Sequence, residues 1–101
     1  MSVMKTNKES YCVKSEHVII WYRNGTDDIY HCVDGPAVEY ISGSSITLGH
    51  KEWWVDGQLH REDGPAIIYA DGIEEWWYRD HRIMVSNLKE FQSYVRNKAF
   101  W

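Results

Sequence analysis

Two histidines recur at one place in a repeated motif. His31 and His60 each stand three residues before the aspartate of an Asp-Gly-Pro-Ala tetrapeptide. Histidine at such a place could serve as a general base or a metal ligand, because its pKa lies near neutrality. A position that a repeat fixes, however, normally serves the repeat. We therefore expect both side chains to be partly buried and to bond a turn carbonyl or the nearby Asp34 and Asp63.

A metal site and paired carboxylates are the other candidates for chemistry. Glu74 and Glu75 are adjacent, so on a strand they would face opposite sides and could not cooperate; Glu62 with Asp63 is the other pair of acids. No Gly-x-Ser-x-Gly or phosphate-binding loop is present. We predict no catalytic residue, no metal and no cofactor. A zinc site would have to use four residues whose spacing matches no usual zinc motif: Cys12, His17, His31 and Cys32.

Charge is distributed unevenly along the 101 residues, whose net charge is −4. Residues 1–23 carry +2, residues 24–78 carry −9 and residues 79–101 carry +3. An acidic surface repels phosphate backbones and attracts basic surfaces. We expect a partner protein with a basic patch and no nucleic acid bound at the acidic part.

Apolar segments are short. The longest run, Val18–Tyr22, has five residues, against about 18 for a membrane span. The first sixteen residues lack the apolar stretch of a signal peptide, and the chain has two cysteines, which we expect to be reduced thiols. These features predict a cytoplasmic protein without a membrane partner.

The chain repeats itself. Aromatic pairs begin at Trp21, Trp53 and Trp76, and the second and third are 23 residues apart. The first and second are 32 apart, because three residues are inserted around "TDD" and six around "SGSSIT". Insertions of this kind fall in loops. The unit is therefore 23 residues long.

Short β-rich segments between turn signals predict the fold. Asn or Asp followed by Gly favours tight hairpin turns, and we interpret each such pair as a chain reversal. The resulting prediction is a mainly β domain, an antiparallel meander of repeated hairpins over residues 17–85, after a loosely ordered or edge-strand segment over residues 1–16. The predicted turn residues are Asn24, Gly25, Asp34, Gly35, Pro36, Asp56, Gly57, Asp63, Gly64, Pro65, Asp71 and Gly72.

A helix is predicted at the C-terminal end, within residues 86–101. Ser86 or Asn87 is the expected N-cap. With Asn87 as the cap, Glu90 completes a capping box, and the helix should run to about Lys98. An apolar stripe along it would pack on the last strands and cap the sheet. The stripe comprises Leu88, Phe91, Tyr94 and Val95.

The segment "WWVDGQLHREDGPAIIYADGIEEWWY" resembles the MORN-variant repeats of bacterial, phage and large-virus proteins. The match spans Trp21 to about Ile83, although the first copy has Cys32 where the second has Arg61. The resemblance implies stacked hairpins used for protein contacts rather than catalysis. It also implies a phage-encoded accessory protein that binds a host protein, such as a defence factor, and modulates or inhibits it.

The aromatic pairs are the main binding hypothesis. Adjacent rings on a strand face opposite sides, so one ring of each pair lies away from the helix, in a cross-strand ladder that can also bind a partner. Alternatives are an acidic nucleic-acid mimic, a small histidine-based or metal-dependent enzyme, and, from the resemblance, a lipid-binding surface. The protein could be a monomer or a homodimer paired through an edge strand at Val18–Tyr22. The expected binding residues are Tyr22, Trp54, His60, Arg61, Glu62, Tyr69, Glu74 and Trp77.

Overall fold

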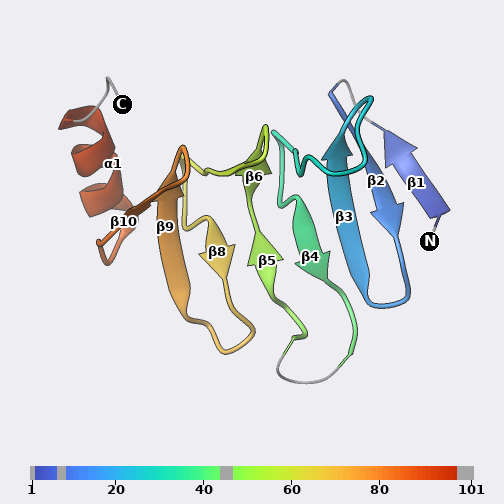
Figure 1. Cartoon of the computed structure of the whole chain (residues 1–101). Coiled ribbons are helices and arrows are strands. Elements are labelled where there is room, and N and C mark those ends of the chain that lie inside the picture. The colour runs from blue at the N-terminus through green and yellow to red at the C-terminus, as the bar shows by residue number, and fades with distance from the viewer. Residues whose placement is uncertain (1, 7–8, 44–46, 98–101) are drawn as a thin grey trace.

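An antiparallel sheet forms most of the protein, with one helix at its C-terminal end (Figure 1). The computed structural model describes residues 2–6, 9–43 and 47–97. The extents of 42 × 33 × 17 Å reflect a sheet that is a single layer over most of its width. The prediction of a mainly β fold with a C-terminal helix is confirmed. The strand order in the main sheet is β1-β2-β3-β4-β5-β8-β9-β10.

The N-terminal segment belongs to the sheet. Strand β2 lies between β1 and β3 and buries Ser10 and Cys12. Strand β3 is bonded on both sides, to β2 and β4, so the expected edge strand at Val18–Tyr22 is wrong and offers no free edge for a dimer. The edge on this side is β1. These strands are β1 (Ser2–Thr6), β2 (Ser10–Lys14), β3 (Val18–Arg23) and β4 (Val38–Tyr40).

The second and third copies supply the remaining strands. Strand β5 pairs with β8, while β6 and β7 form a small two-stranded sheet. Only Trp53 separates β5 from β6, so the two strands follow each other directly and run in the same direction. The meander is thus interrupted at one point in this copy. The strands are β5 (Lys51–Glu52), β6 (Trp54–Val55), β7 (Gln58–Leu59), β8 (Ile67–Ile68), β9 (Glu74–Tyr78) and β10 (His81–Ile83).

The Asp-Gly-Pro-Ala segments do not reverse the chain, in contrast to our interpretation. Strand β7 is antiparallel to β6 and β8 is antiparallel to β5, so β7 and β8 run in the same direction. The Trp53 carbonyl accepts from the N–H of His60, and the Trp53 N–H donates to Ala66. Residues 60–66 therefore form a loop that leaves the sheet and returns to it opposite the same residue, Trp53. The chain then continues in the direction that it had before the loop. The first copy repeats these bonds between Trp21 and the residues His31 and Ala37.

Hydrogen bonds between copies also repeat. The N–H of Cys32 donates to Trp54 O at 3.0 Å, and the N–H of Arg61 donates to Trp77 O at 3.3 Å. In the turns, the N–H of Gly57 donates to Tyr30 O and the N–H of Asp80 donates to Leu59 O. Each copy therefore binds the next through the same backbone groups. The sequence repeat is a structural repeat.

Helix α1 (Leu88–Asn97) covers one side of strands β9 and β10. The Asn87 side chain accepts from the N–H of Glu90 at 2.9 Å, which confirms Asn87 as the N-cap. Phe91 is 1% exposed and packs with Trp76, Tyr78 and Ile83. Of the other three residues in the expected apolar stripe, Val95 packs on the sheet beside Phe91. The prediction is wrong for Leu88 and Tyr94, which are exposed. The expected end at Lys98 lies outside the described residues.

Candidate functional site

The eight expected binding residues lie on two opposite faces. Alternation along β9 places Trp76 and Tyr78 under α1 and Glu75 and Trp77 on the other side. We call the first side the helix face and the second the aromatic face. Tyr22, Trp54, Tyr69 and Trp77 lie on the aromatic face, whereas His60, Arg61, Glu62 and Glu74 belong to the helix face.

A continuous row of rings crosses the N-terminal half of the aromatic face. Ring centroids are 5.8 Å apart for Tyr11 and Tyr22, 5.7 Å for Tyr22 and Tyr30, and 5.4 Å for Tyr30 and Trp54. These are ordinary distances for stabilising aromatic pairs. Sequence reasoning missed Tyr11 and Tyr30. Tyr11 could have been found by assigning residues 10–14 to a strand beside β3.

A second row lies nearer the turns at the other end of the strands. His50 has its ring centroid 5.6 Å from that of Tyr40 and 5.3 Å from that of Tyr69. Its Nε2 atom lies 2.7 Å from a carboxylate oxygen of Glu52. Cross-strand contacts thus hold these side chains on one face. His50 stands outside the repeated motif and was not predicted.

Two carboxylates occupy equivalent places on the aromatic face. Glu52 accepts from the indole N–H of Trp54 at 2.8 Å, and Glu75 accepts from that of Trp77 at 3.1 Å. Each glutamate stands two residues before its tryptophan, so both side chains share a face. The bond fixes the orientation of each ring.

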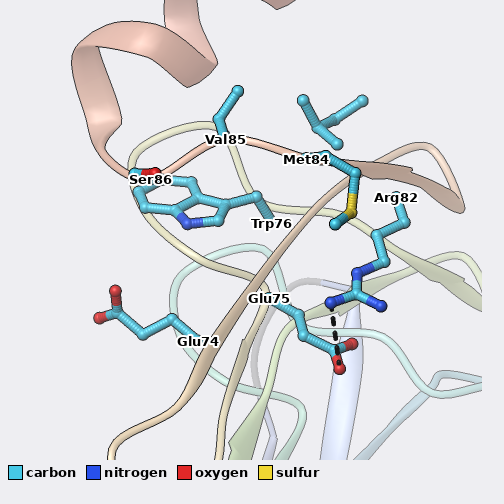
Figure 2. Close-up of a pocket in the computed structure, with 8 residues that line it drawn as sticks. Glu74, Glu75, Trp76, Arg82, Met84, Val85 and Ser86 are labelled. Atoms are coloured by element: carbon cyan, nitrogen blue, oxygen red, sulfur yellow. Dashed lines mark ion pairs between the residues drawn. The ribbon is translucent and has the colours of Figure 1, made fainter.

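Glu75 has two further partners. Tyr69 donates its hydroxyl to Glu75 at 2.9 Å, and Arg82 approaches it at 3.8 Å, as the dashed line in Figure 2 shows. Burial alone would raise the pKa of Glu75, but the bonds from Trp77 and Tyr69 and the charge of Arg82 outweigh it and lower the pKa below its usual value. The same bond, together with burial, raises the pKa of Tyr69. Glu75 is therefore an ionised anchor at neutral pH.

A small cavity of about 230 Å³ lies between β9, β10 and residues 84–86, which lead into α1 (Figure 2). Trp76 and Val85 border it below the helix, and Glu75 and Arg82 border it at the other side. The carboxylate of Glu74 points away from that of Glu75, as adjacent strand residues must. Two of the charges that line this cavity, Glu75 and Arg82, are paired with each other.

Both repeat histidines bind the backbone of the following copy. The Nδ1 atom of His31 accepts from the N–H of Asp56 at 2.8 Å, and that of His60 accepts from the N–H of Arg79 at 3.0 Å. The expected bonds to a turn carbonyl or to Asp34 and Asp63 are wrong, because the Nδ1 atoms accept from backbone N–H groups and the Nε2 atoms lie near Glu9 and Glu62. Each histidine therefore links its own copy to the next one.

The two histidines differ in their surroundings. His31 is 1% exposed and its Nε2 atom lies 3.1 Å from Glu9. His60 is 16% exposed. Burial lowers the pKa of His60, and the charge of Glu62 opposes this only in part. His60 is therefore neutral at neutral pH.

The Arg61 side chain contacts residues of its own copy. Its guanidinium carbon lies 3.9 Å from the ring centroid of Trp53, and the side chain donates to Asp63 at 3.0 Å and to Pro65 O at 3.1 Å. A Cβ atom on Gly64 would lie 2.6 Å from that carbon. Gly64 does not have a positive φ, so its role is to admit Arg61 rather than to turn the chain.

In the first copy, Cys32 stands in the place of Arg61. Cys32 donates to Asp34 at 3.1 Å, and nothing lies within 4 Å of a Cβ atom built on Gly35. Burial first, and the bond to Asp34 second, raise the pKa of Cys32 to about 11. Both cysteines are buried free thiols, and Cys32 is a weak nucleophile because it stays protonated.

Metal and membrane signals are missing from the described part of the chain. Among residues 2–6, 9–43 and 47–97, no group of three His, Cys, Asp or Glu side chains could hold a metal ion. His17 bonds Ser42, and His31 bonds Asp56, so the four residues considered for zinc do not converge. No helix within these ranges is long and apolar enough to cross a membrane.

Comparisons with family models, with curated proteins and with solved structures find no match for this chain.

Proposed function

We propose that this protein is a non-enzymatic binding module whose aromatic face engages a partner protein with a basic patch. The observation that carries the proposal is the fixed arrangement of rings and carboxylates on that face. Trp54 and Trp77 are each held by a glutamate two residues away. Both tryptophans remain partly exposed.

Preorganised aromatic rings suit a binding surface. Tryptophan and tyrosine are enriched among the residues that dominate binding energy at protein interfaces. A side chain that is already oriented loses less rotamer freedom when a partner arrives. The bonds to Glu52 and Glu75 therefore favour affinity as well as stability.

Charge supports a basic partner. Residues 24–78 carry −9, and this range contains Trp54, Trp77 and both anchoring glutamates. Opposite charge on a partner accelerates association and rejects acidic competitors. The narrower proposal, an inhibitor of a host protein acting in the host cytoplasm, is supported only by the resemblance to phage accessory repeats.

A capture experiment tests the proposal. The tagged protein is incubated with lysate of candidate host cells, and retained proteins are identified by mass spectrometry beside a double variant, Trp54→Ala with Trp77→Ala. We expect the variant to lose a specific set of proteins with basic surfaces. The matched control replaces two exposed apolar residues, Ile73 and Met84, by Ala, and should retain that set.

Circular dichroism must show that both variants remain folded. The proposal fails if the double variant retains the same proteins as the unmodified chain. Repeating the capture at high salt separates the nucleic-acid mimic, whose binding would weaken steeply, from an aromatic hot spot, whose binding tolerates salt.

A further inference from the structure

We infer that a groove on the helix face, distinct from the aromatic face, is a docking site for a short amphipathic basic helix of a partner protein. The groove lies between the two repeated loops, residues 32–36 and 60–63, and has a volume of about 600 Å³. Trp53 and Val55 line it between these loops. We call it the loop groove.

The repeat places an equivalent groove one copy further along, and the chain fills that groove itself. Trp76 and Tyr78 of the third copy correspond to Trp53 and Val55 of the second. The third copy has no Asp-Gly-Pro-Ala loop, and α1 lies over these residues instead. Phe91 contacts Trp76 with ring centroids 5.2 Å apart. The structure therefore shows which kind of element fits this position in the repeat.

The character of α1 indicates the character of the missing occupant. It packs two apolar residues, Phe91 and Val95, against the sheet. Arg96 in its last turn borders the same cavity as Glu62. Glu62 also lines the loop groove, because its loop forms the wall between the two grooves.

Charge on the loop groove selects a basic helix. Its rim carries Asp34, Glu62 and Asp63, and the last two are 77% and 83% exposed. The one arginine that lines it, Arg61, is held by Asp63 and Pro65. An incoming Lys or Arg would therefore meet a net negative rim.

Apolar surface at the groove is accessible to such a helix. Val33 on the first loop is 57% exposed, and Val55 between the loops is partly exposed. Arg61 already covers Trp53, so the apolar residues of the occupant would contact Val33, Pro36 and Val55. A helix that presents one apolar stripe and a basic end matches this surface.

The probe for a test is the chain's own helix as a free peptide. An acetylated, amidated peptide of residues 86–97 is titrated into the full-length, nitrogen-15-labelled protein, and amide chemical shifts are followed. We expect shifts at residues 32–35, Val55 and residues 60–63, with the resonances of α1 itself unchanged. Replacing Phe91 by Ala in the peptide should remove the response.

Variants of the full chain locate the binding. Val33→Arg blocks the groove with bulk and positive charge, so the peptide should bind about tenfold more weakly or worse. Ile73→Arg is the matched control, since Ile73 is also exposed, at 60%, but lies outside the groove. Glu62→Gln should weaken binding at low salt only.

Two results would overturn the inference. One is the absence of shifts at the loop residues with excess peptide. The other is a response confined to α1 and Trp76, which would mean that the peptide exchanges with the chain's own helix. Neither result bears on the aromatic face, so this inference can fail while the proposed function stands.

Discussion

The second and third copies cover equivalent tryptophans in two different ways. Arg61 lies over Trp53 and belongs to the loop of the same copy, whereas Phe91 lies against Trp76 and comes from a separate helix. The first cover is a cation held by its neighbours, and the second is a buried ring. The repeat therefore accepts two chemically different covers at this position.

Breaking the helical cover should have the largest effect. Phe91 is 1% exposed and belongs to the buried cluster of Trp76, Tyr78 and Ile83. Phe91→Ala should lower the free energy of unfolding by about 3 to 5 kcal/mol, because it removes buried apolar surface and leaves a cavity. Urea denaturation followed by tryptophan fluorescence measures the change. Leu88→Ala on the exposed side of α1 is the control and should change little.

Removing a repeat histidine should rank second. His31→Ala leaves the N–H of Asp56 without the Nδ1 acceptor and should cost about 1 to 3 kcal/mol. His60→Ala should cost less, since His60 is 16% exposed and His31 is 1% exposed. Thermal unfolding of the two variants gives the order. If His60→Ala lost as much stability as His31→Ala, or more, the idea that burial sets the contribution of each histidine would be wrong.

Breaking the arginine cover should cost less again. Gly64→Ala would push Arg61 off Trp53, because the new Cβ atom would lie 2.6 Å from the guanidinium carbon. We expect a loss of about 1 kcal/mol, the usual scale of a cation over an aromatic ring. The same substitution at Gly35 should be nearly neutral, because nothing lies within 4 Å of its Cβ position.

A double variant tests this explanation of Gly64. In the Arg61→Ala background, Gly64→Ala should have almost no further effect, because the side chain with which it collides is gone. Additive losses measured by urea denaturation would show that Gly64 serves the backbone instead.

Acid should weaken the contact between the second and third copies by the smallest amount. The pKa of His60 is lowered in the folded state, so below the unfolded value of 6.5 the unfolded chain binds more protons. Stability is full above that value, falls as the pH drops through it, and levels off below the folded pKa. His60→Asn keeps an acceptor for the N–H of Arg79 and should flatten this dependence in thermal unfolding between neutral and mildly acidic pH.

Local signals were enough to predict much of the fold from sequence. The repeat, the hairpin pairs such as Asp56-Gly57 and the cap at Asn87 each depend on residues close together in the chain. The path of the Asp-Gly-Pro-Ala loops was not predictable in the same way. Whether such a loop reverses the chain depends on which strand accepts Ala66, and that partner lies 13 residues away at Trp53.

The candidate site was only half predictable for a similar reason. Alternation along a strand placed Trp77 and Trp76 on opposite faces, but the sequence did not show that Arg61 would turn back onto Trp53. Tyr30 was missed because it comes just after the insertion of the first copy and because its counterpart in the second copy, Leu59, is not aromatic. Its bridge to Tyr22 depends on how that insertion closes.

The order of strands in the sheet has a consequence for synthesis. Neighbours in the main sheet follow one another along the chain, with only the β6–β7 pair set aside. Each strand therefore finds a pairing edge already made by residues that left the ribosome before it. We expect the sheet to grow during translation from β1 toward β10, and α1 to pack on β9 and β10 only after these strands have formed.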